Sequence, residues 1–248
     1  TVPARVGVSI TNPGAAPGSL KASRYLWGTD YHILMKPRLA RLLAAAQARV
    51  PNLHGRVCVD TAPLLERQLA VRAGLGWQGK HTLLIAGKDG SWGFLGVLLL
   101  DLELPPDAPV TTEHCGTCVA CLEACPGGAL EPFLMDPARG LTTYTVETEA
   151  EPPPVAAAAL AESRWAAGCD ACQEACPWNR APVWGDPALW GGPSRLHQAP
   201  AQDLRVNGSK WKKLTRRTAL RRVRHRHWLR TLDRILGRPA GGTQSFIE

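Results

Sequence analysis

The fold of this chain is decided by two stretches, CGTCVACLEACP at residues 115–126 and CDACQEACP at residues 169–177. The first has the spacing Cys-x2-Cys-x2-Cys-x3-Cys-Pro, in which three thiolates bind one iron–sulfur cluster and the fourth, before proline, binds a second. Seven of the eight cysteines of the chain lie in these two runs. The pattern therefore predicts a ferredoxin-like domain with two [4Fe-4S] clusters, and hence electron transfer.

The crossing of ligands between the two runs gives a testable ligand map. Four cysteines are expected to hold one cluster: Cys115, Cys118, Cys121 and Cys176. Three are expected to hold its neighbour: Cys125, Cys169 and Cys172. A full ferredoxin repeat would have its remaining cysteine at position 166, where this chain has Ala166. The second cluster therefore lacks one protein thiolate.

Two other uses of clustered cysteines fit less well. A zinc site typically has two CxxC pairs separated by a longer loop, and the overlapping spacings here differ from that pattern. A disulfide scaffold is typical of small secreted chains, but no secretory segment precedes these runs and a chain of 248 residues can bury a core of its own. We therefore favour iron–sulfur clusters over both.

The composition is that of a chain with a buried core, since 45% of its residues are hydrophobic. The longest apolar run, Phe94–Leu100, is much shorter than the roughly 20 residues that cross a bilayer. We therefore expect a soluble, cytoplasmic monomer that does not bind a membrane. Residues 5–10 (RVGVSI) read as a strand close to Thr1, so we expect an amino-terminal part of the natural protein to be missing.

Positive charge is concentrated at the carboxyl end of the chain. The net charge is +8, yet residues 201–248 contain 13 of the 29 Lys and Arg residues and only 3 of the 21 Asp and Glu residues. Segregated positive charge favours a polyanion partner, because neutralising phosphates releases condensed counterions. The alternative is a solvated helix face with no partner.

Before the cysteine runs, the hydrophobic pattern alternates between helix and strand. We expect a helix over residues 36–50, a strand over 55–60, a helix over 62–73, a glycine-rich connection over 74–85 that enters a short strand, and a strand over 92–104. Strands that alternate with helices indicate an α/β domain. Pro105 and Pro106 end it, so residues 1–106 are assigned to the first domain.

The cluster domain is assigned to residues 107–183, with a proline-containing spacer at 147–161. Residues 184–248 are assigned to a basic helical region, so the overall class is α+β with an α/β part. Within that region, residues 209–237 are expected to form one amphipathic helix whose arginines face outward. Its apolar stripe should dock on the body and consists of Leu220, Val223, Leu229, Leu232 and Leu236.

Six stretches together make the chain resemble the epoxyqueuosine reductase (QueG) family over nearly all of its length. They are YLWGTDYH at 25–32, VDTAP at 59–63, GLGWQGKH at 74–81, SWGFLG at 91–96, the first cysteine run, and CDACQEACPWN at 169–179. The ferredoxin motif alone is shared by many redox proteins. Its combination with the 74–81 loop and the CPWN ending is specific.

The resemblance implies a cobalamin-dependent oxidoreductase that reduces epoxyqueuosine to queuosine in tRNA, the last step of queuosine biosynthesis. It also implies a cobalamin-binding α/β domain, a two-cluster domain, a C-terminal helical part that helps to hold tRNA, and an external electron donor. The basic carboxyl end agrees with a tRNA partner. We expect six of its side chains to contact nucleic acid: Lys212, Lys213, Arg221, Arg222, Arg224 and Arg226.

Asp60, within the 59–63 stretch, matches the family's proton donor. Conversion of an epoxide to an alkene takes up electrons and protons and releases the oxygen as water, so a general acid is needed. The position of Asp60 at the end of an apolar strand would allow burial to raise its pKa. The alternative interpretation is that Asp60 caps a helix that starts at Ala62.

The resemblance also implies cobalamin contacts from eight residues: Trp27, Asp60, Leu84, Leu95, Leu99, Thr142, Asp170 and Ala171. For each leucine the alternative is ordinary core packing. His32 and His81 could be read as metal ligands, but the family does not use a protein histidine in that way. We expect hydrogen-bonding roles for both.

The chain departs from the family between the two cysteine runs. The family has a segment of the form RCISYLTIE, whereas the matching residues 139–147 read RGLTTYTVE, which places Gly140 where a cysteine ligand is expected. This agrees with the missing thiolate deduced from spacing. Cys58, the remaining thiol, is expected to face the core or the cobalamin pocket. The second cluster should then have an iron without a protein thiolate.

Three other interpretations stay open. A reductive dehalogenase-like cobalamin enzyme acting on a small molecule would give no reason for the basic carboxyl end. A dicluster electron carrier without catalysis would leave the 74–81 loop and the 59–63 stretch unexplained. A homologue that binds tRNA but no longer turns over is compatible with Gly140.

Overall fold

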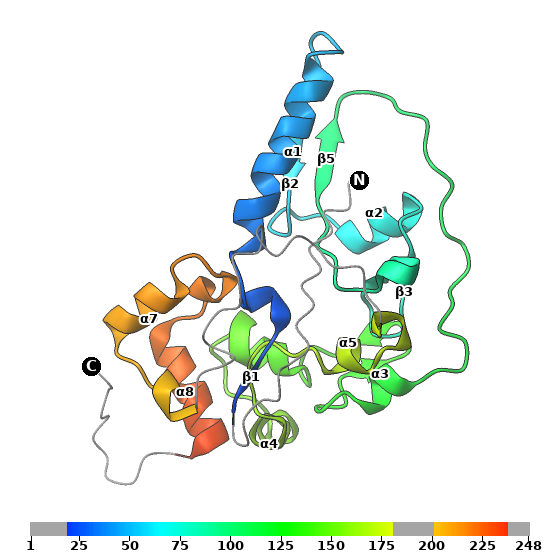
Figure 1. Cartoon of the computed structure of the whole chain (residues 1–248). Coiled ribbons are helices and arrows are strands. Elements are labelled where there is room, and N and C mark those ends of the chain that lie inside the picture. Colours follow the sequence, from blue (N-terminus) through cyan, green and yellow to red (C-terminus); the bar gives the residue numbers. More distant parts are fainter. Residues whose placement is uncertain (1–18, 181–200, 238–248) are drawn as a thin grey trace.

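The computed structural model describes residues 19–180 and 201–237 (Figure 1). The expected strand at 5–10 and part of the expected basic region lie outside the described residues. The helices are η1 (Arg24–Leu26), α1 (Tyr31–Gln47), α2 (Glu66–Arg72), η2 (Gly87–Asp89), α3 (Ala120–Glu123), η3 (Thr143–Glu147), α4 (Pro154–Ser163), α5 (Ala171–Ala175), η4 (Pro177–Asn179), η6 (Ala201–Leu204), α7 (Gly208–Thr215), η7 (Ala219–Arg222) and α8 (His225–Leu236). The strands are β1 (Lys21–Ala22), β2 (Gly55–Cys58), β3 (Trp77–Gln78), β4 (Leu84–Ile85), β5 (Val97–Leu100), β6 (Leu130–Glu131), β7 (Leu134–Met135) and β8 (Trp165–Ala167).

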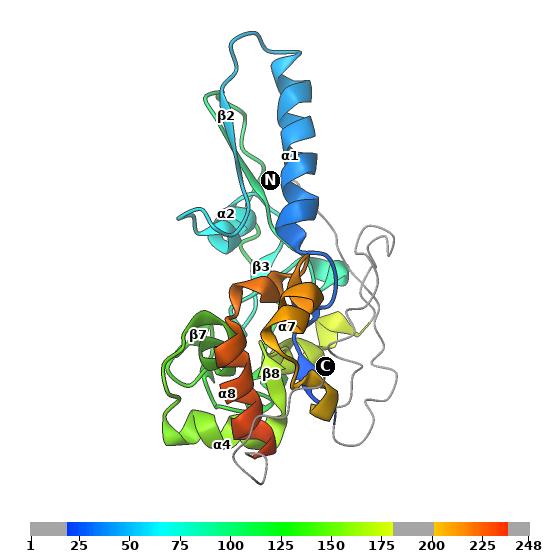
Figure 2. The same cartoon turned by 90° about the vertical axis from the view of Figure 1, so that its left-hand side faces the viewer.

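Helix α1 and the β2–β5 pair form an arm that stands away from the rest of the molecule (Figures 1 and 2). The two strands pair antiparallel, from Gly55 opposite Leu100 to Cys58 opposite Val97. The predicted strands at 55–60 and 92–104 are therefore confirmed, although each is shorter than expected. Asp60 follows directly after β2, so the base of the arm is where the predicted proton donor lies.

Both helices predicted for the amino-terminal half are present with shifted starts. α1 covers most of the predicted 36–50 helix but begins five residues earlier. The reason is a cap: the Asp30 carboxylate accepts a hydrogen bond from the backbone N–H of His32 at 3.0 Å. α2 begins later than predicted, because the residues before it form turns in which the N–H of Leu64 donates to the carbonyl of Ala62 at 2.7 Å.

The described strands form four two-stranded sheets. β1 and β8 pair in parallel, which places residues 21–22 beside residues 165–167 and so brings the start of the described chain next to the second cysteine run. The other three pairs are antiparallel. The expected mixture of helix and strand is confirmed. The α/β character of a cobalamin domain over 1–106 stays a prediction.

One hydrophobic core joins segments that lie far apart in the sequence. Leu26 and Met35 from the amino-terminal part, Ala167 from β8, and Leu220 and Leu232 from the C-terminal region are each at most 1% exposed. Burial of such side chains is the main stabilising contribution, at about 25 cal/mol per Å² of apolar surface. All three predicted domains contribute to this core, and their boundaries stay predictions.

The C-terminal region is not the single helix predicted for residues 209–237. It consists of α7, η7 and α8, with extended backbone at Thr218 and Arg224. At the end of α7, the carbonyl of Thr215 accepts from the backbone N–H of Thr218 at 3.0 Å and from Thr218 Oγ1 at 3.2 Å, and these bonds compete with helix continuation. The apolar stripe docks on the body as predicted: Leu220, Val223, Leu229 and Leu232 are buried, and Leu236 is partly buried.

The described helices are short or have a polar face. α1 is the longest of them, with 17 residues. Within residues 19–180 and 201–237, no helix has both the length and the apolar character that crossing a membrane requires.

Candidate active site and cluster sites

Four cysteines surround one cavity of about 270 Å³. They are Cys115, Cys118, Cys121 and Cys176, the same four that the ligand-crossing rule assigns to one cluster. Burial raises the pKa of Cys121, and the neighbouring Cys176 and Cys115 raise it further. Sulfur donors around a space of this volume suit a cluster of several irons.

The other three cysteines of the two runs lie close to one another. Burial is the main reason that the pKa of Cys169 is raised to about 12, with smaller contributions from Asp170 and Cys125. Burial likewise raises the pKa of Cys172, with contributions from Cys169 and Cys125. The backbone N–H of Ala129 donates to Cys125 Sγ at 3.2 Å. The structure therefore brings the predicted second set together.

All eight cysteines are free of disulfides. Among the described residues, no three His, Cys, Asp or Glu side chains are placed to share a single metal ion. Cys58 is 2% exposed at the end of β2 and does not belong to either cysteine set. It therefore faces the core, one of the two positions expected for it.

Gly140, the position at which the resemblance expects a cysteine ligand, has room for a side chain. A Cβ atom there would lie 3.6 Å from the Pro137 carbonyl and from Thr143 Oγ1, which are ordinary van der Waals contacts. The next residue, Leu141, belongs to the small core against which Cys169 packs. There is room for a Cβ atom at this position, and the residue that occupies it has no thiol.

A larger cavity, of about 320 Å³, lies where the base of the arm, α5 and the C-terminal region meet. Three of the residues predicted to contact cobalamin line it, namely Asp60, Thr142 and Asp170, together with Arg222 from the set predicted to contact nucleic acid. The other lining residues are Ser23, Arg24, Tyr25, Tyr31, Leu83, Ser91, Trp92, Gly93, Phe94, Glu147 and Gln173. The rings of Tyr31 and Phe94 stack with centroids 4.3 Å apart, so carboxylates and an aromatic wall face the same space.

Asp60 is held at the cavity by its backbone and by His32. Its φ of +56° is in the left-handed region, which aspartate tolerates better than most residues, and its N–H donates to Glu66 Oε1 at 2.8 Å. His32 Nε2 lies 3.7 Å from Asp60 Oδ2, while His32 Nδ1 contacts Asp30 Oδ1 at 2.8 Å. The expected hydrogen-bonding role of His32 is confirmed, and the three side chains form a line Asp30–His32–Asp60.

Two expectations for Asp60 are wrong. Burial was expected, but its side chain is 50% exposed. The helix-cap interpretation also fails, because α2 starts at Glu66 with Leu65 at its cap position. Tyr31, which contacts Asp60, is buried instead. Burial strongly raises the pKa of Tyr31, and the charge of Asp60 and a hydrogen bond with Asp60 raise that pKa further.

Asp170 ties the second cysteine run to the start of the described chain. Its carboxylate accepts hydrogen bonds from Ser23 Oγ and, at 2.7 Å, from the backbone N–H of Arg24. The side chain is 2% exposed, and burial raises its pKa to about 6. The Arg24 guanidinium lies 4.1 Å from the centre of the Trp92 ring, a cation–π contact. This network forms the part of the cavity wall nearest to the second cysteine set.

Asn179, the last residue of the CPWN ending, fastens the cluster domain to the cavity wall. Its Oδ1 accepts from the Ser91 N–H at 2.7 Å, and its Nδ2 donates to Ser91 Oγ at 2.9 Å. Gln173 Oε1 accepts from Ser91 Oγ at 2.9 Å. A side chain at Gly90 would collide with Asn179 Oδ1, since its Cβ would lie 2.2 Å away. Two stretches that carried the resemblance thus meet in one network.

Five residues assigned to cobalamin contact do not line this cavity. Trp27 is buried, and its indole N–H donates to a backbone carbonyl at 2.8 Å. Leu84 and Leu95 are partly buried, Leu99 is 41% exposed on β5, and Ala171 begins α5. Their cofactor contacts stay predictions.

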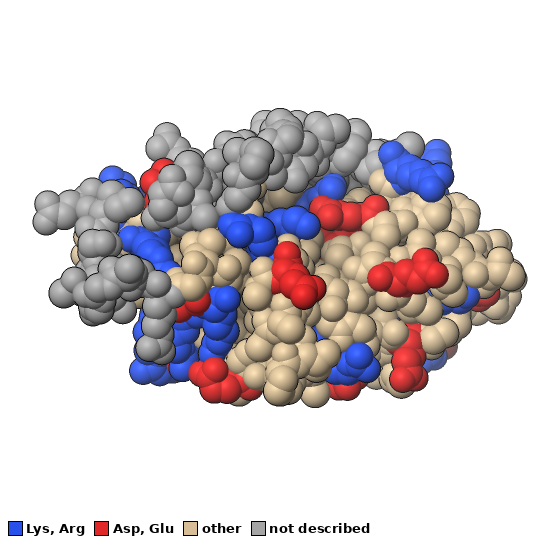
Figure 3. Space-filling view, turned by 90° about the horizontal axis from the view of Figure 1, so that it is seen from below, with Lys and Arg blue, Asp and Glu red and all other residues tan. Residues whose placement is uncertain are grey.

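The basic side chains expected to hold nucleic acid fall into two groups. Arg222, Arg224 and Arg226 form ion pairs with Glu147 or Glu149, at 2.5 Å, 3.4 Å and 3.0 Å respectively. The others are exposed and form no ion pair with any described residue: Lys212, Lys213 and Arg221. Figure 3 shows lysines and arginines gathered, with acidic residues beside them, on the side of the molecule where Figure 1 has α7 and α8.

The paired group extends along α8. Arg230 contacts Glu149 at 3.5 Å, and Arg234 contacts Glu151 at 2.5 Å. Glu147 ends η3, and Glu149 and Glu151 follow it at alternate positions, so this segment is joined to η7 and α8 by a row of ion pairs. We call this row, from Arg222 to Arg234, the arginine–glutamate ladder. The expectation that the arginines face outward is confirmed for Arg224 and Arg226, whose side chains are 69% and 68% exposed, but their charges are paired with glutamates.

Sequence reasoning missed most of the cavity wall. Tyr25, Tyr31, Trp92 and Phe94 lie within the 25–32 and 91–96 stretches that carried the resemblance, so a signal for them was available. Arg24 and Ser23 precede the first stretch and gave no signal, because their partners are more than 140 residues away in the sequence.

Comparisons with known proteins bear on these features. Residues 114–179 match the family model "4Fe-4S double cluster binding domain", and residues 8–61 match "Epoxyqueuosine reductase QueG, DUF1730". Epoxyqueuosine reductase of Salmonella typhimurium strain LT2 is 42% identical over 217 residues, which cover 87% of this chain and 56% of that protein. The enzyme of the same name from Synechococcus sp. strain CC9605 is 40% identical over 218 residues, covering 87% of this chain and 67% of that protein. This chain belongs to the epoxyqueuosine reductase family.

The fold agrees with this membership. A solved structure of epoxyqueuosine reductase with an epoxyqueuosine-modified tRNA-Tyr stem loop has a TM-score of 0.82 to this chain at 23% identity, covering 94% of this chain and 62% of that one. The chain thus spans little more than half the length of its Salmonella relative. In this epoxyqueuosine reductase family member, the double-cluster match coincides with the two cysteine sets.

Proposed function

We propose that this chain carries the reductive chemistry of an epoxyqueuosine reductase, converting epoxyqueuosine to queuosine in tRNA. The observation that supports it is that Asp60 and Asp170 line one cavity of about 320 Å³. Asp170 lies between Cys169 and Cys172 in the chain, so a proton donor and an electron source meet at this cavity. The relatives bear the name epoxyqueuosine reductase.

The reaction sets requirements that the cavity residues can meet. The epoxide takes up two electrons and two protons, both C–O bonds break, a C=C bond forms, and the oxygen leaves as water. Clusters pass electrons singly. We assign Asp60 as the donor of a proton to the departing oxygen, because its carboxyl is open to the cavity. His32 Nε2, 3.7 Å from Asp60 Oδ2, returns the proton between turnovers, with Asp30 fixing the ring.

Cobalamin is expected from the family resemblance, and when bound it supplies a cobalt centre that accepts single electrons and acts on the C–O bond. The cavity volume is at the lower end of the 300–1,000 Å³ typical of small-molecule sites. A cavity of about 320 Å³ is large enough for a group of nucleoside size. The roles assigned here to Asp60, His32 and Asp170 concern the substrate and its protons.

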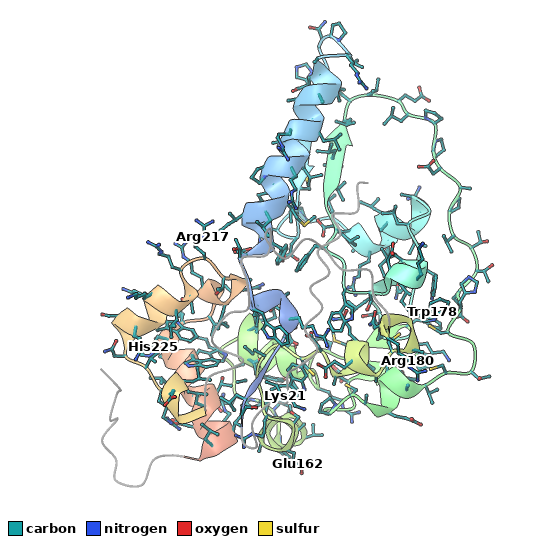
Figure 4. The ribbon with its side chains drawn as sticks, viewed as in Figure 1. Lys21, Glu162, Trp178, Arg180, Arg217 and His225 are labelled. Carbon is teal, nitrogen blue, oxygen red and sulfur yellow. The ribbon has the colours of Figure 1, made fainter. Side chains whose placement is uncertain are left out.

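The substrate side of the proposal rests on a surface next to the cavity. Five exposed cations of α7 and η7 have no ion-pair partner among the described residues: Lys212, Lys213, Arg216, Arg217 and Arg221. We call them the α7–η7 cation group. Arg217 lies next to the start of α1 (Figure 4), where its carbonyl accepts from the Asp30 N–H at 2.7 Å. A tRNA backbone on this group would place an unstacked anticodon base toward the cavity.

An external electron donor re-reduces the clusters, and the chain acts as a cytoplasmic monomer. A dicluster carrier would need no proton donor, and a dehalogenase-type enzyme would need no α7–η7 cation group. Both features favour the reductase over these alternatives.

An anaerobic assay tests the function. The chain with reconstituted clusters, cobalamin, a strong reductant and epoxyqueuosine-containing tRNA should yield queuosine, measured by nucleoside mass spectrometry. Asp60→Asn should abolish product while cofactor absorbance and tRNA binding stay at wild-type levels. Asp101→Asn, which changes an exposed carboxylate paired with His54 on the arm, is the matched control and should retain activity. Product formation by Asp60→Asn at the wild-type rate would remove the assigned role of Asp60.

A further inference from the structure

His81 lies beside the first cysteine set, outside the chemistry assigned above. It is 3% exposed and lines the same 270 Å³ cavity as the four cysteines of that set. A histidine buried this deeply is expected to have both ring nitrogens satisfied. Among the residues that the structure describes, only one of the two nitrogens of His81 has a hydrogen-bond partner.

The protonation of the His81 ring follows from its neighbours. The backbone N–H of Leu83 donates to His81 Nδ1 at 3.2 Å, so Nδ1 is the acceptor and the proton of the neutral ring is on Nε2. Burial lowers the pKa of His81 to about 4, which keeps the ring neutral near pH 7. The Nε2–H is buried and has no hydrogen-bond partner among the described residues. An unpaired donor of this kind is unfavourable unless the cavity supplies an acceptor.

The loop that carries His81 is shaped for this position. The N–H of Thr82 donates to the Gly79 carbonyl at 2.8 Å, and Thr82 has a φ of +70°, which is rare for a β-branched residue. Arg67 holds that strained residue by donating to its carbonyl at 2.7 Å. A Cβ atom at Gly79 would lie 2.9 Å from His81 Cε1, so only glycine leaves room for the ring.

The same loop is fastened to the cysteine run itself. Lys80 Nζ donates to the carbonyls of Gly116 and Cys118 at 2.6 Å and 3.0 Å. The residue next to His81 therefore fixes the loop that bears two of the four cysteines. The position of the His81 ring relative to the cavity is therefore fixed by contacts within its own loop and by the bonds from Lys80 to the cysteine run.

We propose that His81 donates a hydrogen bond from Nε2 to a sulfur atom of the cluster bound by Cys115, Cys118, Cys121 and Cys176, and thereby raises the reduction potential of that cluster. The inference rests on the proposed cluster site and not on the reaction. A donor to cluster sulfur stabilises the reduced form, which carries the extra negative charge. His81 is then a residue that sets how readily this cluster accepts electrons from the donor.

Potentiometric titration followed by EPR tests the inference on the chain with both clusters reconstituted. His81→Leu, which removes the donor, should shift the midpoint potential of one cluster to a lower value and leave the other unchanged. His81→Gln, whose amide nitrogen reaches about as far as Nε2, should restore most of the wild-type potential. His114→Leu is the matched control, because His114 lines the same cavity but is exposed.

The outcomes separate this inference from the proposed function. Unchanged potentials in His81→Leu, with wild-type iron content and EPR amplitude, would overturn the hydrogen bond while leaving the reductase proposal intact. A strong nitrogen coupling in pulsed EPR of the wild-type cluster would also overturn it, since that signal means direct iron ligation by the ring. A chain that binds no cluster in any variant would remove the cluster site itself, and with it both proposals.

Discussion

The guanidinium of Arg222 lies 2.5 Å from the carboxylate of Glu147, and both side chains line the cavity that contains Asp60. The two side chains are 46% and 47% exposed, and ion pairs as open as this contribute only about 0–1 kcal/mol to stability. Glu147 therefore neutralises, at a contact that is easily exchanged, one of the two arginines that line the cavity. A tRNA phosphate is a natural replacement for that carboxylate.

This relationship predicts opposite effects of the two partners on substrate binding. Glu147→Gln should tighten binding of an epoxyqueuosine-containing anticodon stem loop by up to about fivefold, because the competing carboxylate is removed. Arg222→Gln should weaken binding and reduce the salt slope by about one phosphate interaction. Fluorescence anisotropy at several salt concentrations measures both. Identical dissociation constants for Glu147→Gln and the wild type would mean that the carboxylate does not compete with tRNA.

The two groups of cations should differ in their effect on tRNA affinity. The combined variant Lys212→Ala/Lys213→Ala/Arg221→Ala should weaken stem-loop binding and flatten its salt dependence by about 0.7–0.9 for each phosphate that the variant no longer neutralises. These side chains have no carboxylate partner in the described part of the chain, so their charge is available to a phosphate.

The control for that variant keeps the net charge constant. In Arg226→Ala/Glu149→Gln, one positive and one negative charge of the arginine–glutamate ladder are removed together, and binding should change little. If this pair lowered affinity as much as the triple variant, the part of the ladder beyond Arg222 would also belong to the tRNA surface, and its ion pairs would not keep these arginines from binding phosphate.

Gly140 gives a prediction about iron content. As reconstituted, the chain should contain fewer than eight irons, or show one cluster with three-cysteine character, because the second set offers only three thiolates. Gly140→Cys should bring the iron content to eight, since a Cβ there meets no atom closer than 3.6 Å. Iron analysis with Mössbauer spectroscopy measures this, and Gly140→Ser provides a control of similar size. Eight irons in two all-thiolate [4Fe-4S] clusters of the unmodified chain would contradict the prediction that the second cluster lacks one protein thiolate.

Features that depend on the spacing of nearby residues could be predicted from the sequence, whereas contacts between distant segments could not. The grouping of Cys115 with Cys176 was predictable because the ligand-crossing rule is a rule of spacing, and the structure brings that set together. The contact of Ser23 with Asp170 was not, because it depends on the β1–β8 pairing of segments about 145 residues apart. The break between α7 and α8 was missed because hydrophobic periodicity takes no account of the Thr218 hydroxyl, which donates to the carbonyl of the last residue of α7.

The arginine–glutamate ladder shows that charge counts, like hydrophobic periodicity, take no account of contacts between distant segments. Net charge correctly marked residues 201–248 as basic, but sequence alone does not say which charges are neutralised by contacts. Glu149 comes from a segment that looked like a plain spacer, and it contacts Arg224, Arg226 and Arg230. Charge counts therefore overestimate the surface that is free to bind a polyanion.

The pH dependence of stability should report on His227, which is 2% exposed in α8. Burial lowers its pKa, and Arg230 and Arg234 lower it further, while Glu149 acts in the opposite direction. The folded chain therefore resists a proton that the unfolded chain accepts at about 6.5. The contribution of the neutral His227 ring to the free energy of unfolding is fully present above that pH and declines as the pH falls below it.

Melting temperatures of the cluster-loaded chain between pH 8 and pH 5 test this effect. The wild type should lose stability below about pH 6.5 more steeply than His227→Gln, whose side chain fills a similar volume but cannot become charged. His54→Gln is the control, because the His54 side chain is 82% exposed and lies on the arm, far from α8 in the sequence. Parallel curves for the wild type and His227→Gln would show that a group other than His227 sets the acid limit of the C-terminal region.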